Sequence, residues 1–171
     1  MPVRSSTNTI FKATFLLIIV VSSIFLVMST SNYVEFFIAV RELSLQTLDV
    51  SASIGPEDVS ITLVFAICNP TRYTGLAFQQ LTYTLLFEVD DNNTTLYGGL
   101  ISYRAAPEPI GAYSNMTFNE EISLNPNVIS TEDFRSLYET RQEDITWILQ
   151  GTAIFLSFVG TIDVPLSDEF S

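Results

Sequence analysis

The sequence predicts a mainly β fold: an immunoglobulin- or fibronectin-like antiparallel β-sandwich of about seven strands with one short helix, preceded by an N-terminal transmembrane helix. Two observations lead to this. Apolar and polar residues alternate through Val59–Asn69 and Leu81–Val89, and successive side chains of a strand point to opposite faces, so each segment has one face to bury. Ahead of them, Ile10–Met28 is apolar except for Lys12 and a few Ser and Thr residues.

The apolar segment is long enough to cross a bilayer. At ~1.5 Å per residue, Ile10–Met28 spans about 28 Å as a helix, close to the thickness of the hydrocarbon layer. A cleaved signal peptide is the alternative, because Ser29–Ser31 offers small residues for cleavage, although no Ala-x-Ala step follows. Arg4 precedes the segment, Lys12 lies at its start, and every acidic residue follows it. The positive-inside rule therefore predicts a single-pass membrane protein with its body on the extracytoplasmic side.

These observations divide the chain into four parts. We expect a short cytoplasmic tail (1–9), a transmembrane signal-anchor helix (10–31), a juxtamembrane linker (32–42) and a β-sandwich domain (43–171). The sequence leaves open whether Tyr33–Val40 extends the helix or begins the sheet. Membrane lipid is the partner expected for the helix.

Turn residues separate the expected strands. The segments with period-two alternation or strand-forming composition are 43–54, 59–69, 81–89, 96–103, 110–124, 145–156 and 158–164. Gly98-Gly99 suggests a β-bulge, and Pro107 and Pro109 break the strand pattern. A helix should start at Ser130 or Thr131 and end near Arg141, because acidic residues favour a helix N-terminus.

Asn69-Pro70 is the expected structural turn at the end of the first alternating strand. Proline has no N–H for the strand ladder, and asparagine tolerates turn geometry and bonds nearby backbone. We therefore expect the Asn69 side chain to bond backbone groups of the turn that leads to the next strand.

A β-branched strand that ends in Cys68-Asn69-Pro70-Thr71, followed by Leu81–Leu85, resembles the late embryogenesis abundant group 2 (LEA-2) family, which overlaps the WHy (water stress and hypersensitive response) domain. The closing stretch Trp147–Val164, with Gly151 and Gly160, is also similar to the end of that family's domain. The resemblance covers roughly Leu43 to Phe170. It implies a stress-protective (desiccation or water-stress) or surface-organising role. Together with the predicted anchor, the leading hypothesis is a non-enzymatic, membrane-anchored LEA-2/WHy-like domain.

Composition argues against several classes of function. The net charge is −12, from 19 acidic and 7 basic residues, which disfavours nucleic acid because phosphate binding needs clustered Lys and Arg. The chain has no His and one Cys. An internal disulfide is therefore impossible, and the usual His-activated nucleophile is missing. Cys68 is expected to be a small packing residue.

No acidic cluster predicts catalysis or metal binding. Adjacent acidic pairs occur at Glu57-Asp58, Asp90-Asp91, Glu120-Glu121, Glu132-Asp133 and Glu143-Asp144. Neighbours on a strand point to opposite faces, whereas a catalytic dyad needs two carboxylates across a cleft. A calcium loop starting at Asp91 fails because Leu96 and Ser102 replace the required Gly and Glu. We expect no enzyme activity, cofactor or metal.

Three asparagines are candidate glycosylation acceptors. Asn92, Asn93 and Asn115 each begin an Asn-x-Ser/Thr sequon. The first two fall in the expected hairpin turn 90–93, where exposure would favour a transferase.

Two other functions compete with the LEA-2-like role. LEA-2-like domains also occur in lipid-handling proteins, so the body could bind a lipid or other apolar ligand in a cleft between its sheets. Such a cleft would be lined by Phe65, Tyr83, Phe87, Phe118 and Trp147, which are otherwise ordinary core. Alternatively, the chain could be a subunit of a surface filament or membrane complex with protein partners, contacted through Tyr33–Val40.

Overall fold

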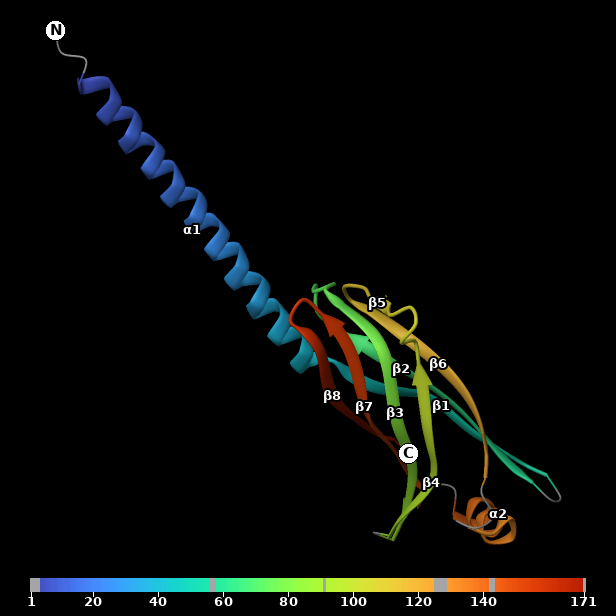
Figure 1. Ribbon diagram of the computed structural model, residues 1–171. Helices are drawn as coiled ribbons and strands as arrows, with labels where there is room; N and C mark the ends of the chain where they lie inside the picture. The colour runs from blue at the N-terminus through green and yellow to red at the C-terminus, as the bar shows by residue number, and fades with distance from the viewer. Residues whose placement is uncertain (1–3, 56–57, 91, 125–128, 142–143, 171) are drawn as a thin grey trace. The chain divides into compact units, whose positions relative to one another are not determined.

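The computed structural model describes residues 4–55, 58–90, 92–124, 129–141 and 144–170 (Figure 1). The chain divides into two compact units, one ending at Ile38 and one running from Ala39 to Ser171. Pro56, Asp91 and 125–127, where turns or a strand end were predicted, lie outside the described residues.

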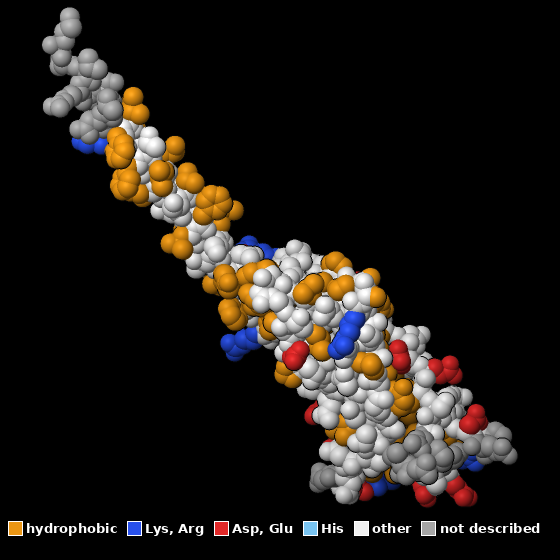
Figure 2. Space-filling model, in the orientation of Figure 1, with side chains coloured by type: hydrophobic (Ala, Val, Ile, Leu, Met, Phe, Trp, Pro, Cys, Tyr) orange, Lys and Arg blue, Asp and Glu red, His pale blue; other side chains and the backbone are white. Residues whose placement is uncertain are grey.

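The first unit is helical. Helix α1 runs without interruption from Arg4 to Glu42, so Tyr33–Val40 extends the helix. Its large apolar side chains between Ile10 and Met28 have exposed fractions from 42% at Val21 to 75% at Phe11, and Figure 2 shows them along the helix. By length and composition, α1 is the one helix in the described part of the chain that could cross a membrane.

Polar residues within α1 bond to the helix itself. The hydroxyls of Thr14, Ser23 and Thr30 donate to the carbonyl oxygens four residues earlier, at 3.0, 2.8 and 2.8 Å. A hydroxyl satisfied in this way needs no water. The hydroxyls of these three residues therefore do not oppose burial of the helix in lipid.

The second unit is an antiparallel β-sandwich, which confirms the predicted fold class. One sheet has the strand order β1-β2-β6, with β1 Ser44–Ile54, β2 Val59–Asn69 and β6 Ser114–Ser123. The other has the order β4-β3-β7-β8, with β5 also paired to β3. Its strands are β3 Leu76–Val89, β4 Asn92–Ser102, β5 Glu108–Ile110, β7 Thr146–Ser157 and β8 Gly160–Phe170.

The alternation read from the sequence separates core from surface. In β2 the residues from Val59 to Ile67 with odd numbers are all buried, and in β3 those from Leu81 to Val89 are buried. The inner faces of the two sheets meet through these side chains, as expected for a sandwich core.

Helix α2, Thr131–Arg141, lies where the sequence predicts it. Ser130 caps it: its Oγ accepts from the Asp133 N–H at 3.0 Å and donates to the Asp133 carboxylate at 2.6 Å. Phe134 is completely buried, with its ring 6.2 Å from that of Phe87. The helix thus packs on the β3 side of the core.

Three strand predictions need correction. The expected strand 110–124 is two strands, because Tyr113 has a left-handed backbone (φ 50°) and the chain passes there from one sheet to the other. The bulge in β4 lies at Leu96, not at Gly98-Gly99. The last strand continues past Val164 to Phe170 and includes Pro165.

Candidate functional site

The Asn69 side chain ties three segments together. It is 1% exposed. Its Nδ2 donates to the carbonyl oxygens of Tyr73 at 2.8 Å and Gly111 at 2.9 Å, and its Oδ1 accepts from the Thr71 N–H at 3.1 Å and hydroxyl at 2.7 Å. Each polar atom therefore makes two bonds, and the side chain is occupied within the fold. Pro70, beside it, is exposed.

The candidate glycosylation residues are all exposed. Asn92 and Asn93 are the first residues of β4 and pair with Val89 and Glu88, respectively. They therefore belong to the strand and not to the turn 90–93 that the sequence predicts. Asn115 is exposed on β6.

The Asp90 carboxylate at this turn binds an arginine. Its two oxygens accept from the Arg141 guanidinium at 2.6 and 2.8 Å. This hydrogen-bonded pair lowers the pKa of Asp90 and raises the pKa of Arg141. In the described part of the chain, no three His, Cys, Asp or Glu side chains are grouped to hold a metal ion.

The five aromatic residues proposed to line a cleft pack against one another instead. Their exposed fractions run from 0% at Phe65 to 7% at Trp147. The ring of Phe65 lies 5.5 Å from Tyr83 and 5.2 Å from Phe118, and Phe87 lies 6.5 Å from Trp147. Side chains that fill the space between the sheets in this way form the core and leave no cleft among themselves.

Tyr83 carries the one hydroxyl of that group. It lies between Gly99 and Gly151 in the strand register, and its Oη donates to the Glu120 carboxylate at 3.3 Å. Burial, and then the nearby negative charge of Glu120, raise the pKa of Tyr83 well above its ordinary value. A neutral phenol bonded to one carboxylate is a structural pair, because it holds no nucleophile at neutral pH.

A hollow beside Trp147 is the feature that sequence reasoning missed. It has a volume of about 390 Å³ and is lined by Thr47, Leu48, Asp49, Val50, Tyr138, Ile145, Trp147 and Phe170. A bulge at Leu48 in β1 displaces the strand there. The Thr47 hydroxyl is buried and has no hydrogen-bond partner among the described residues. This orphaned group beside a hollow of mixed polar and apolar lining is a candidate ligand-binding feature.

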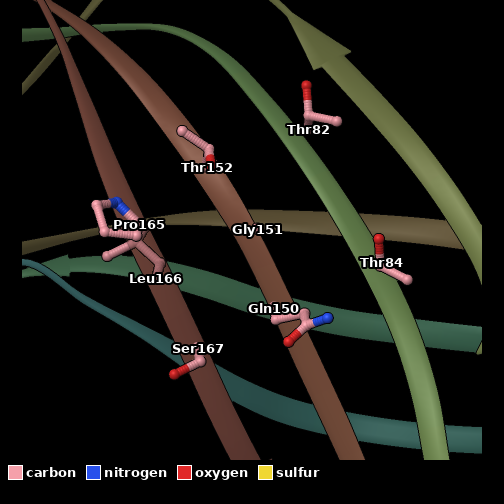
Figure 3. A pocket seen from close by; sticks show the side chains of 8 residues that line it. All are labelled: Thr82, Thr84, Gln150, Gly151, Thr152, Pro165, Leu166 and Ser167. Atoms are coloured by element: carbon pink, nitrogen blue, oxygen red, sulfur yellow. The ribbon is translucent and has the colours of Figure 1, made fainter.

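A second depression, of about 650 Å³, lies on the outer face of β3, β7 and β8 (Figure 3). Its polar side chains are those of Thr82, Thr84, Gln150, Thr152 and Ser167, all neutral. Without a titratable group, this surface supports neither acid–base chemistry nor metal binding.

No protein-family model and no curated protein sequence matches the chain. Among solved structures, the chain is similar to a protein of Arabidopsis thaliana at 17% identity and a TM-score of 0.47, over 74% of this chain and 78% of that one. It is also similar to a candidate late embryogenesis abundant (LEA) protein at 16% identity and a TM-score of 0.47, over 93% and 86%. A protein from Archaeoglobus fulgidus matches at 10% identity and a TM-score of 0.38, over 73% and 94%. The structural neighbours thus include a protein named for the LEA group that the sequence resembles, and at these scores the similarity assigns neither an activity nor a partner.

Proposed function

We propose that the chain is a single-pass membrane protein whose β-sandwich is a non-enzymatic, LEA-2/WHy-like module with a stress-protective or surface-organising role on the extracytoplasmic side. One observation supports the anchor above the others: the apolar side chains of α1 are exposed all around the helix from Ile10 to Met28. Water-exposed apolar surface of this extent is rare in soluble monomers, and a bilayer would bury it.

The continuity of α1 favours a permanent anchor over a cleaved signal peptide. Cleavage near Ser29–Ser31 would cut the helix well before its end at Glu42. The β1 strand follows directly, and the Leu43 N–H still donates to the Ala39 carbonyl at 3.0 Å.

Topology is tested with the full chain in intact cells. Protease added outside should remove the sandwich and leave residues 1–9 protected, because Arg4 and Lys12 resist translocation. In a host that glycosylates, the protein should gain mass from an attached glycan. The double variant Asn92→Gln, Asn93→Gln should lose this mass, whereas Asn115→Gln alone should keep it. A sandwich protected from external protease would reverse the topology and remove the case for glycans.

The protective role is tested separately from the anchor. The full chain in lipid nanodiscs should preserve more activity of a drying-sensitive reporter enzyme through desiccation than empty nanodiscs do. Equal losses with and without the protein would exclude direct protection and leave the surface-organising role.

The Thr47 hydroxyl favours a second candidate function, binding of a small apolar ligand that carries one hydrogen-bonding group. The expected site is the hollow beside Trp147 rather than the space between the sheets. The proposed ligand would pack on the rings of Trp147 and Phe170 and satisfy the buried hydroxyl.

Trp147 is the only tryptophan, so its fluorescence reports on the hollow directly. We expect 2,2,2-tribromoethanol, an apolar quencher with one hydroxyl, to quench it saturably in the full chain in nanodiscs. Thr47→Val, which keeps the shape and removes the hydroxyl, should weaken that binding several-fold. Quenching that rises linearly, or that is unchanged in Thr47→Val, would count against the site.

A further inference from the structure

Four connections meet at one end of the sandwich, here called the tether end: residues 39–43, 70–75, 103–113 and 157–160. The strand register places β1 Ser44 beside Cys68 near the end of β2, and β3 Ala77 beside Leu156 near the end of β7. The Tyr113 N–H donates to the Thr71 carbonyl at 2.8 Å, which joins two of the connections. Figure 1 shows β5 and the β7–β8 hairpin at this end and α2 at the opposite end.

Exposed apolar and aromatic side chains gather at the tether end. Tyr103, Tyr113, Phe158 and Val159 have exposed fractions of 40, 72, 48 and 47%. The other exposed large apolar side chains in the described part of the sandwich are Leu48, Leu100 and Leu156, which lie on strands. At the α2 end, the described connections expose no large apolar side chain.

Charge is also divided between the ends. The tether-end segments contain Arg41, Arg72 and Arg104 against Glu42 and Glu108. Among the residues that the structure describes, the segments 55–58, 90 and 124–145 at the α2 end carry two arginines and six carboxylates, namely Asp58, Asp90, Glu132, Asp133, Glu139 and Asp144. Figure 2 shows most of the acidic side chains on the visible face of the sandwich toward the α2 end.

We propose that the tether end rests in the lipid headgroup region of the bilayer that α1 crosses, which makes it a second, interfacial membrane contact. This inference rests on the proposed anchoring and places the exposed rings of Tyr33 and Phe37, late in α1, in the headgroup region. From Phe37 the first strand, at Ser44, is about 10 Å away along the helix, and it starts at the tether end. Tyrosine rings with one apolar and one polar side favour the membrane interface. Arginine guanidinium groups pair with lipid phosphates.

The charge distribution selects this end over the other. Carboxylates near a leaflet of anionic lipids are repelled, and the α2 end carries more of them than the tether end does. The tether end offers the lipid surface exposed rings and three arginines. The interfacial contact would hold the sandwich in one orientation, with its acidic end toward water.

The test uses the full chain with Cys68→Ser, reconstituted in liposomes of phosphatidylcholine with some phosphatidylglycerol. Single cysteines replace Tyr113 and Val159 at the tether end, and each is spin-labelled. Leu48→Cys is the matched control, an exposed apolar residue on a strand, and Ser123→Cys marks the last residue of β6. Phe15→Cys reports on the anchor. Collisions with oxygen, which concentrates in lipid, are compared with those of a water-soluble nickel chelate.

Labels at Tyr113 and Val159 should show an oxygen-to-nickel collision ratio several-fold above those at Leu48 and Ser123. In addition, Arg72→Gln with Arg104→Gln should lower the ratio at Val159. Equal ratios at Val159 and Leu48, with Phe15 deep in lipid, would overturn the interfacial contact and leave the anchor intact. A water-accessible label at Phe15 would overturn both.

Discussion

Trp147→Ala is expected to lower the free energy of unfolding of the sandwich by about 3–5 kcal/mol, the usual cost of removing a large buried aromatic side chain. Trp147 lies on β7 and is 7% exposed. Its ring packs on Phe87, which in turn contacts Phe134 of α2. The substitution therefore loosens both the sheet and the helix that covers it.

The measurement is pulse proteolysis of the full chain in micelles across a urea series, because the variant has no tryptophan to follow. Leu100→Ala is the matched control: Leu100 is 62% exposed on β4, so its loss should change stability by about 0.5 kcal/mol or less. A Trp147→Ala variant within about 1 kcal/mol of the parent would contradict the burial of Trp147.

The alternation of β2 and β3 could be predicted because it depends only on which side chains face the core. Each strand turns one face to the opposite sheet and the other to solvent, so side chains two residues apart share the same face. Alternation of apolar and polar residues in the sequence therefore corresponds to alternation of buried and exposed side chains. The cap of α2 was likewise local, since Ser130 and Asp133 are three residues apart. Local signals of this kind do not require knowledge of the partners.

The glycine and proline signals needed tertiary context. Gly99 suggested a bulge, yet a side chain there would collide with the ring of Tyr83 on the neighbouring strand, so close packing is the reason for glycine. The predicted strand ends at Val164, before Pro165, yet β8 continues through Pro165 to Phe170. Because β8 is the edge strand of its sheet, the missing N–H of a proline is tolerated there. Each residue has two physical explanations, and the sequence does not distinguish them.

The hollow beside Trp147 could not be predicted at all. It depends on an irregularity at Leu48 and on segments almost one hundred residues later, Tyr138 and Ile145. Thr47 in isolation is an ordinary strand residue. Only the assembled fold shows that its hydroxyl is buried without a described partner.

Asn69→Ala is expected to destabilise the sandwich by about 2–4 kcal/mol, more than a typical single hydrogen bond is worth. The substitution removes the donor to the Tyr73 carbonyl and both bonds to Thr71. The Gly111 carbonyl loses one of two donors, because the Ser114 hydroxyl also bonds to it at 2.7 Å. The tie between β2 and the β5–β6 turn would therefore weaken, and the Tyr113–Thr71 contact next to it should loosen with it.

The emission of Trp147, far from the substitution in the strand register, follows urea unfolding of the full chain in micelles. Asn69→Asp separates the two halves of the side chain: it keeps the acceptor that holds Thr71 and loses the donor to Tyr73 and Gly111. We expect it to lose most of the same stability, because a carboxylate would face two carbonyl oxygens. Asn115→Ala, at an exposed asparagine on β6, is the control and should unfold like the parent. A midpoint for Asn69→Ala equal to that of Asn115→Ala would show that the bonds of Asn69 do not stabilise the fold.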